Sequence, residues 1–277
     1  MPGSGSWRLT VAELTDGLKI WLAYFRLHYR ASLAYRKSFW LQIVGMFLNN
    51  TAFVIIWGVF FKTFPNSLAS HGITMPHAFL LFALMSSSYG CVSLLCGGAF
   101  TLSDQIVQNR LDTILILPRH PYFLTLLSKS YVSGWGDFAF GLLLFLISQQ
   151  ITVVVCGLFL FFTVTSCAVL TATIMILQSL SFFMGNSEQV HRLGTMGMIT
   201  FGAYPEEIFS NAARFCMYTI LPVGIYIYLP VKTVLHPSFF LFACVIASSV
   251  FVVLLSIKVF NAGLCRYESG NQMAALK

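Results

Sequence analysis

Charged residues are scarce in this sequence. Of its 277 residues only 9% are Asp, Glu, Lys or Arg, whereas 57% are hydrophobic and the mean hydropathy is +0.80. A soluble domain carries about 25% charged residues, so the composition excludes a soluble enzyme, a nucleic-acid-binding domain and a disordered chain. The nine acidic and sixteen basic residues cluster, and most charge-free runs between them exceed the ~20 residues that a spanning helix needs. The sequence therefore predicts an integral membrane protein.

Catalytic and nucleotide-binding motifs are also missing. There is no Gly-x-x-x-x-Gly-Lys-Ser/Thr loop, no His-Glu-x-x-His and no Gly-x-Ser-x-Gly. The seven cysteines form no CxxC pair and the six histidines are scattered. We expect that the chain is not an enzyme, has no catalytic residues, and binds no metal or cofactor itself.

Charge is also absent from the middle of the expected spans. Asp137 and Glu188 are expected at span ends, whereas transporters driven by an ion gradient usually keep acidic residues at mid-membrane. Coupling to an ion gradient is therefore disfavoured, although backbone carbonyls could still bind Na⁺.

The hydrophobic pattern predicts one all-α transmembrane domain over residues 1–277, with six spans. The loop after the first span is expected at 63–75, and the 50 uncharged residues at 138–187 suit a hairpin that turns near 149–152. Within the second span Ser86, Gly90, Ser93 and Gly97 have the spacing that lets helix backbones approach closely. The expected spans cover 38–61, 78–102, 131–150, 154–184, 189–205 and 238–258.

An amphipathic helix is expected before the first span, at residues 10–30. Thr10 and Glu13 form a capping-box pattern, and an apolar stripe of Leu14, Leu18, Trp21 and Phe25 lies opposite mostly basic residues. Such a helix lies in the headgroup layer; the alternative is a solvated helix packed on a soluble partner. Residues 1–37 have no uninterrupted apolar core, so a secretory signal peptide is not expected.

Prolines interrupt the apolar region after the fifth span. Pro222 and Pro230 break residues 215–231, and irregular backbone at membrane depth must be covered by protein or line a cavity. We therefore expect a re-entrant external segment at 206–231; a seventh span is the alternative. With six spans and both termini cytoplasmic, thirteen of the sixteen basic residues lie inside, in agreement with the positive-inside rule.

The connection from Asn109 to Pro121 reads NRLDTILILPRHP. It resembles the Gly-x-Leu-Asp/Glu-x-x-Leu-x-x-Pro-x-x-Pro stretch of type-2 ATP-binding-cassette permeases. Asn109 stands where that family usually has Gly, but Asn tolerates left-handed backbone geometry. Further stretches that resemble the family in order and spacing are Gly136-Asp137, Ser181–Gly185, Tyr204-Pro205, Leu221-Pro222-Val223 and Tyr228-Leu229-Pro230.

The resemblance implies the permease subunit of an ATP-driven exporter in the bacterial inner membrane. The expected partners are a second permease subunit, the same or homologous, the lipid bilayer, and cytoplasmic ABC ATPase subunits that bind ATP and Mg²⁺. On that model the segment 104–130 is a cytoplasmic coupling element that enters a groove of the ATPase; an ordinary polar linker is the alternative. The expected ATPase-coupling residues are Arg110, Asp112, Ile114, Leu117, Pro118, Arg119, Tyr122 and Phe123.

Polar side chains in the spans are candidates for a substrate path. Asn49, Asn50, Ser87 and Gln178 could face the substrate, but interhelical hydrogen bonds explain them equally well. Glu206 and Glu207, in the external segment with Pro222, could attract a cationic substrate or simply be solvated. An ATP-independent secondary transporter and a membrane assembly factor remain alternative functions, and the sequence does not identify the substrate.

Overall fold

The computed structural model describes residues 11–65, 72–148, 152–185 and 187–267, and none of these residues lies in a strand. Thr10 and the turn residues 149–151 lie outside the described residues. Helix α1 (Val11–Leu33) meets α2 (Arg36–Thr63) at an elbow formed by Ala34 and Tyr35. The all-helical class that the sequence predicts is confirmed for the described chain.

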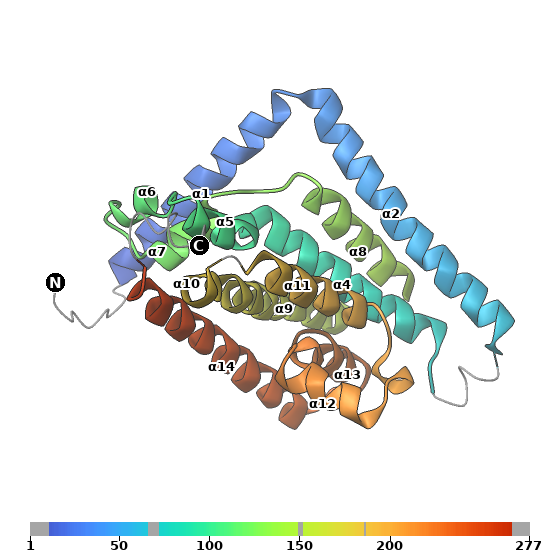
Figure 1. Cartoon of the computed structure of the whole chain (residues 1–277). Helices are drawn as coiled ribbons and strands as arrows, with labels where there is room; N and C mark the ends of the chain where they lie inside the picture. Colours follow the sequence, from blue (N-terminus) through green and yellow to red (C-terminus); the bar gives the residue numbers. More distant parts are fainter. Residues whose placement is uncertain (1–10, 66–71, 149–151, 186, 268–277) are drawn as a thin grey trace.

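The long helices form one bundle. α2 lies on one flank of the molecule and α14 (Phe239–Leu264) on the other (Figure 1). Between these flanks lie α4 (Met75–Leu95), α8 (Gly134–Ser148), α9 (Val153–Ser179) with α10 (Ser181–Met184), and α11 (Glu188–Gly202).

Two groups of short elements occupy opposite ends of the bundle (Figure 1). The α7 end holds η1 (Gly97–Thr101), α5 (Leu102–Val107), α6 (Asp112–Leu115) and α7 (Pro121–Leu127). The α12 end holds η2 (Glu206–Ile208), α12 (Asn211–Thr219), the π-helical turn η3 (Gly224–Tyr228) and α13 (Leu229–Leu235).

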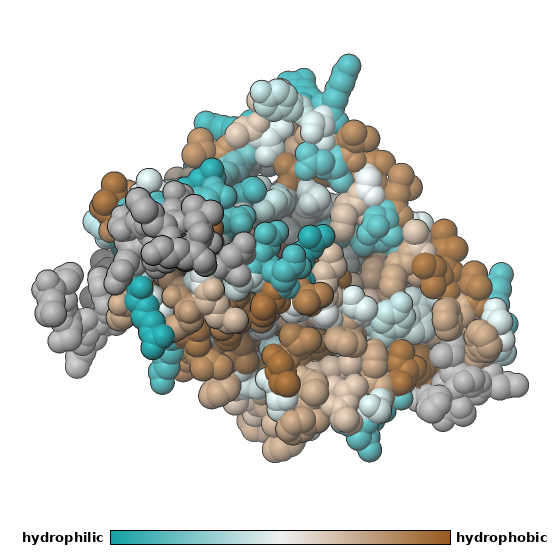
Figure 2. All heavy atoms as spheres, viewed as in Figure 1, coloured by the Kyte–Doolittle hydropathy of each residue, from teal (hydrophilic) through white to brown (hydrophobic). Residues whose placement is uncertain are grey.

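Four helices are long and apolar enough to cross a membrane: α2, α4, α9 with α10, and α14. A fifth span results if α12 and the helix over 224–235 count as one element, although they meet at 86°. α8 and α11 have 15 residues each, or about 22 Å of helix, which is less than the ~30 Å hydrocarbon core. Figure 2 shows hydrophobic residues over most of the face formed by α12, α13 and α14.

The core centres on α4, which packs against α8 at very short range. A Cβ atom added to Gly90 of α4 would lie 2.6 Å from the amide nitrogen of Phe138, and one added to Gly141 of α8 would lie 2.6 Å from that of Ser87. Gly97 approaches the carbonyl oxygen of Lys129 in the same way. The close approach that the small residues of the second span predict is confirmed at Gly90 and Gly97.

Candidate functional site

The segment 104–130 changes direction at Asn109. This is the one non-glycine residue with positive φ, 55°, in the part of the chain that the structure describes. The amides of Arg110 and Leu111 both donate to the carbonyl oxygen of Gln105, at 2.9 and 3.2 Å. A left-handed residue commonly ends a helix, and Asn tolerates that geometry. The prediction that Asn109 preserves the turn is confirmed.

An apolar tip follows this turn, between α6 and α7. Ile116 is 82% exposed and Leu117 is 41% exposed, with Pro118 exposed beside them. The amide of Arg119 donates to the carbonyl oxygen of Leu117 at 2.8 Å, which bends the chain here. We call residues 116–118 the apolar tip. Ile114, by contrast, packs against the core, so its side chain does not belong to the tip.

The three charged residues expected at the ATPase contact flank the tip in sequence. Arg110 is exposed, whereas Asp112 and Arg119 are each half-buried. Exposed charge at the rim of an apolar patch mainly steers association and selects the partner. The segment thus presents an apolar centre with charged neighbours, a composition typical of an interface.

Tyr122 faces the interior, contrary to the expectation that it enters a pocket on a partner. Its hydroxyl lies 2.9 Å from Ser256 Oγ, and its ring meets the Phe260 ring edge-on with centroids 5.3 Å apart. Both residues belong to α14, and burial raises the pKa of Tyr122 to about 12. Phe123 is half-buried. The contacts of Tyr122 therefore hold α7 against α14 and leave its side chain unavailable to a partner.

A histidine begins α7. His120 Nδ1 accepts a hydrogen bond from the Tyr122 amide at 3.2 Å, and Pro121 occupies the first turn. Only an unprotonated Nδ1 can accept this bond. Burial lowers the pKa of His120 below its ordinary value, which favours the form that caps the helix.

Gln178 joins the segment 104–130 to α9. Its Oε1 accepts from the Ser103 amide and its Nε2 donates to the Phe100 carbonyl oxygen, both at 2.9 Å. These backbone groups lie where η1 gives way to α5, so the regular helical hydrogen bonds are interrupted there. Both ends of the amide are used inside the chain, and the expectation that Gln178 faces a substrate path is wrong.

A row of buried serines continues from this junction. Ser103 Oγ lies 2.6 Å from Ser181 Oγ, which in turn lies 2.6 Å from Ser187 Oγ. All three side chains are buried. They connect α5 to α10 and to the residue before α11, so the α7 end is joined to three parts of the bundle by buried hydrogen bonds.

Asn50 also bonds within the chain. Its Nδ2 donates to Asp137 Oδ1 at 2.8 Å and lies 3.5 Å from Ser86 Oγ, which donates to the Asp137 carbonyl oxygen at 2.8 Å. All three residues are buried. Asp137 lies in the first turn of α8, as expected for the start of a span, but its partners Asn50 and Ser86 lie near the middle of α2 and of α4.

Of the predicted path residues, Asn49 alone is exposed. Ser87 is fully buried, and a Cβ atom added to Gly141 would lie 2.2 Å from its Oγ. Ser87 therefore belongs to the contact between α4 and α8. The structure separates the four candidates: Asn50, Ser87 and Gln178 are interior packing residues, whereas Asn49 lies on the open face of α2.

The α12 end contains an ion pair that the sequence analysis did not foresee. Glu206 is 8% exposed; it pairs with Lys232 of α13, and its Oε2 accepts from Tyr218 Oη at 2.7 Å. Arg214 donates from Nε to the Glu206 carbonyl oxygen at 2.9 Å and from Nη2 to that of Glu207 at 3.0 Å. The expectation of a solvated carboxylate is therefore wrong for Glu206, which holds α12 and α13 together.

Pro222 lies at the bend of the same end. It is buried between α12 and η3, and its carbonyl oxygen accepts from the amides of Ile225 and Tyr226 at 3.1 and 3.2 Å. A proline lacks the amide that would continue the preceding helix. This explains why the chain turns by 86° here.

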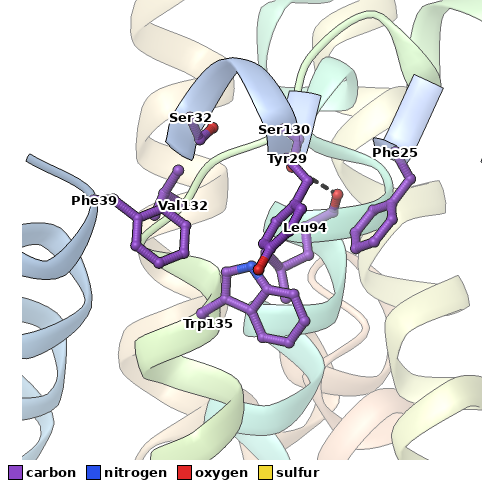
Figure 3. A pocket seen from close by; sticks show the side chains of 8 residues that line it. All are labelled: Phe25, Tyr29, Ser32, Phe39, Leu94, Ser130, Val132 and Trp135. Carbon is purple, nitrogen blue, oxygen red and sulfur yellow. Dashed lines mark hydrogen bonds between the residues drawn. The ribbon is translucent and has the colours of Figure 1, made fainter. Parts of the chain in front are cut away.

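Helix α1 is held to α8 by aromatic rings and to α7 by a hydrogen bond. Trp135 of α8 lies 6.4 Å from Phe25 and 6.4 Å from Tyr29, measured between ring centroids (Figure 3). His28 Nε2 lies 3.1 Å from the carbonyl oxygen of Leu127, at the end of α7. Leu18 is 59% exposed. The face of α1 that packs on the bundle therefore includes Phe25 and His28 but not Leu18.

α11 carries an open face that the sequence analysis missed. Arg192, Met196 and Thr200 recur every four residues and are all exposed. Tyr204, just after the helix, lies 5.8 Å from Trp57 of α2 between ring centroids. Tyr204 thus brings the residues that follow α11 against α2. The mixed polar and apolar period of residues 188–202 was the available signal.

Comparison with known proteins gives one match. A family model described as ABC-2 family transporter protein matches residues 47–271, which is most of the chain. Searches of curated proteins and of solved structures give no match. Among the described residues, no group of three or more His, Cys, Asp or Glu side chains is placed to hold a metal ion.

Proposed function

Because this chain belongs to the ABC-2 family of transporter proteins, and is thus a membrane transport subunit of an ABC transporter, we propose that it forms the translocation path of an ATP-driven exporter. The carrying observation is the apolar tip, where Ile116 is 82% exposed on a segment that is otherwise held to the bundle. In this proposal separate cytoplasmic ABC ATPase subunits bind ATP and Mg²⁺, and they contact the tip.

The attachments of the segment support its use as a coupling element. Gln178 holds η1 and α5 to α9 through one backbone hydrogen bond each, and Tyr122 holds α7 to α14. A force applied at the tip therefore acts on two long helices. An ordinary linker would need neither attachment, since a free loop satisfies its backbone with water.

We propose six spans: α2, α4, α8, α9 with α10, α11, and α14. The short helices α8 and α11 complete their crossings with the adjoining residues 128–133 and 203–205. The bent elements α12, η3 and α13 then form a re-entrant segment, whose backbone is covered by its own protein as lipid requires. This arrangement places both termini in the cytoplasm of a bacterial cell and follows the positive-inside rule.

A second permease subunit, identical or homologous, completes the path in this proposal. The faces of α2 and α11 are open in the single chain, and they combine apolar residues with Asn49, Arg192 and Thr200. Polar groups on a face surrounded by lipid are costly. A partner subunit with an aqueous path between the two chains provides the environment that these residues need.

Co-purification tests the coupling contact. Ile116→Ala with Leu117→Ala is expected to weaken ATPase retention by about 2 to 4 kcal/mol, as truncation of interface hot spots does. Val153→Ala is the control, because Val153 is 91% exposed at the far end of the bundle. Full ATPase retention and full substrate-stimulated hydrolysis in the double variant would refute the coupling role of the tip.

Cysteine labelling tests the topology. On a cysteine-free background, single cysteines at Thr113 and Arg266 are expected to react only from the cytoplasm, and a cysteine at Ser210 only from outside. Labelling of Arg266→Cys from outside would contradict six spans and support a seventh.

A further inference from the structure

Asp137 is an isolated carboxyl group in the interior of the bundle. It is 3% exposed and lies between the middle of α2 and the middle of α4. One oxygen, Oδ1, accepts from Asn50 Nδ2 at 2.8 Å, whereas the other, Oδ2, is buried and has no hydrogen-bond partner. The exporter mechanism proposed above uses neither oxygen.

The groups that face Asp137 carry no positive charge. α2 contributes Asn50, and it has no charged residue between Lys37 and Lys62. α4 contributes Ser86 and the phenol of Tyr89, which lies close enough to interact electrostatically with Asp137. No salt bridge to Asp137 is formed by the residues that the structure describes.

An ionised carboxylate is poorly supported in this environment. One amide hydrogen bond and the first turn of α8 favour the charged form modestly. The loss of hydration on burial costs far more when no cation compensates it, and buried groups in that situation become neutral instead. Burying the neutral acid with one unmet hydrogen bond therefore costs less free energy than burying the ionised carboxylate.

A metal cation is not a fitting counter-charge here. Hard cations need several oxygen ligands, and no metal-binding group of His, Cys, Asp or Glu occurs among the described residues. The neighbouring contact between α4 and α8 is closed by Gly141, where even an added Cβ atom would lie 2.2 Å from Ser87 Oγ. A proton needs neither further ligands nor space.

We propose that Asp137 is a proton-binding site within the membrane domain. When α2, α4 and α8 are packed as observed, Oδ2 carries a proton taken from water, and Oδ1 is the carbonyl oxygen that accepts from Asn50. A movement of α2 away from α8 removes the Asn50 hydrogen bond and exposes the acid to water. The protonation state of Asp137 therefore depends on whether α2 is packed against α8.

Infrared spectroscopy of the full chain in lipid nanodiscs tests this site. The chain has four aspartates, and Asp137 is the one buried among those described. With ¹³C in the aspartate carboxyl groups, the wild-type protein at about pH 5, where a solvated Asp with its pKa of about 3.9 is still ionised, is expected to show an isotope-sensitive carbonyl band of a protonated acid. Absence of that band would overturn the proposal.

Two variants assign the band. Asp137→Asn should remove it, whereas Asp104→Asn, a change at an exposed aspartate of α5, should leave it in place. If Asp137→Asn does not fold, Asn50→Leu provides the assignment: the band should remain and move to higher frequency, because the carbonyl oxygen has lost its donor. A band that survives in Asp137→Asn, or stays unmoved in Asn50→Leu, would contradict the site.

Discussion

Helices α2 and α4 are equally hydrophobic but occupy opposite kinds of environment. Their most apolar windows have the same mean hydropathy, 1.8, yet 11% of the α2 window and 78% of the α4 window is buried within the chain. Hydropathy therefore indicates which segments enter a membrane and says nothing of their place in the bundle. α4 is an interior helix, and α2 is a boundary helix whose outer face is left for lipid or a partner.

The glycines within the two helices differ in the same way, although Gly136 of α8 approaches the Ile43 carbonyl oxygen of α2 closely. An added Cβ atom at Gly90 of α4 would meet the backbone of α8 at 2.6 Å, whereas Cβ atoms at Gly45 and Gly58 of α2 would meet nothing within 4 Å. In lipid, close backbone approach is a main source of helix association. The same residue type thus marks a closed contact in α4 and open surface in α2.

The largest effect is expected from adding side-chain volume at one glycine of each helix. Gly90→Val forces α4 and α8 apart and should cost about 3 kcal/mol or more, at the upper end of overpacking penalties. Gly45→Val should leave the monomer fold unchanged. Thermal stability of the purified chain in detergent measures both. Equal losses in the two variants would mean that α2 is as closely packed as α4.

Polar residues should separate in the same way, with a smaller loss. Gln178→Leu leaves the Ser103 amide and the Phe100 carbonyl oxygen buried without partners, at about 1 to 3 kcal/mol each. Asn49→Leu, on the open face of α2, should not lower monomer stability. Denaturation by heat compares the two, and a stable Gln178→Leu variant would show that its hydrogen bonds are replaceable.

Tyr122→Phe should have a more modest effect. The substitution keeps the edge-on contact with Phe260 and removes only the hydrogen bond to Ser256, so about 1 kcal/mol is expected. ATPase retention should be unaffected, because the side chain faces α14. A loss of ATPase binding with unchanged stability would instead place Tyr122 at the partner contact.

The smallest effect concerns pH at the α7 end. His120 has a lowered pKa in the folded chain, so the unfolded chain binds more protons and the contribution of His120 to stability falls as the pH drops below about 6.5. Hydrogen exchange in residues 120–127 should quicken in that range. His120→Asn keeps a capping side chain that does not titrate, so its exchange protection should not change with pH in this way. The same pH response in the wild-type chain and in His120→Asn would exclude His120 as the cause.

The sequence predicted local features well. Asn109 could be assigned to a left-handed turn because its short polar side chain determines that preference locally. Gly90 and Gly97 could be assigned to a close helix contact because their spacing is visible in one segment. Charge-free length identified the long membrane helices for the same reason.

Long-range contacts were beyond the sequence. Nothing in one sequence shows that Tyr122 meets Ser256, 134 residues later, or that Gln178 bonds to the backbone of Ser103. The run from Ile114 to Leu117 is continuously apolar, so it has no period to show that Ile116 alone points fully outward. The partners of Asp137 were beyond the sequence as well, because Asn50 and Ser86 lie 87 and 51 residues earlier.

Photocrosslinking at Ile116 tests the central claim most directly. A photoreactive amino acid at position 116 of the full complex, in native membranes, is expected to form a covalent adduct with an ABC ATPase subunit, while the same amino acid at Val153 forms none. No ATPase adduct at position 116, or equal adducts at both positions, would contradict the account of the apolar tip as the coupling contact.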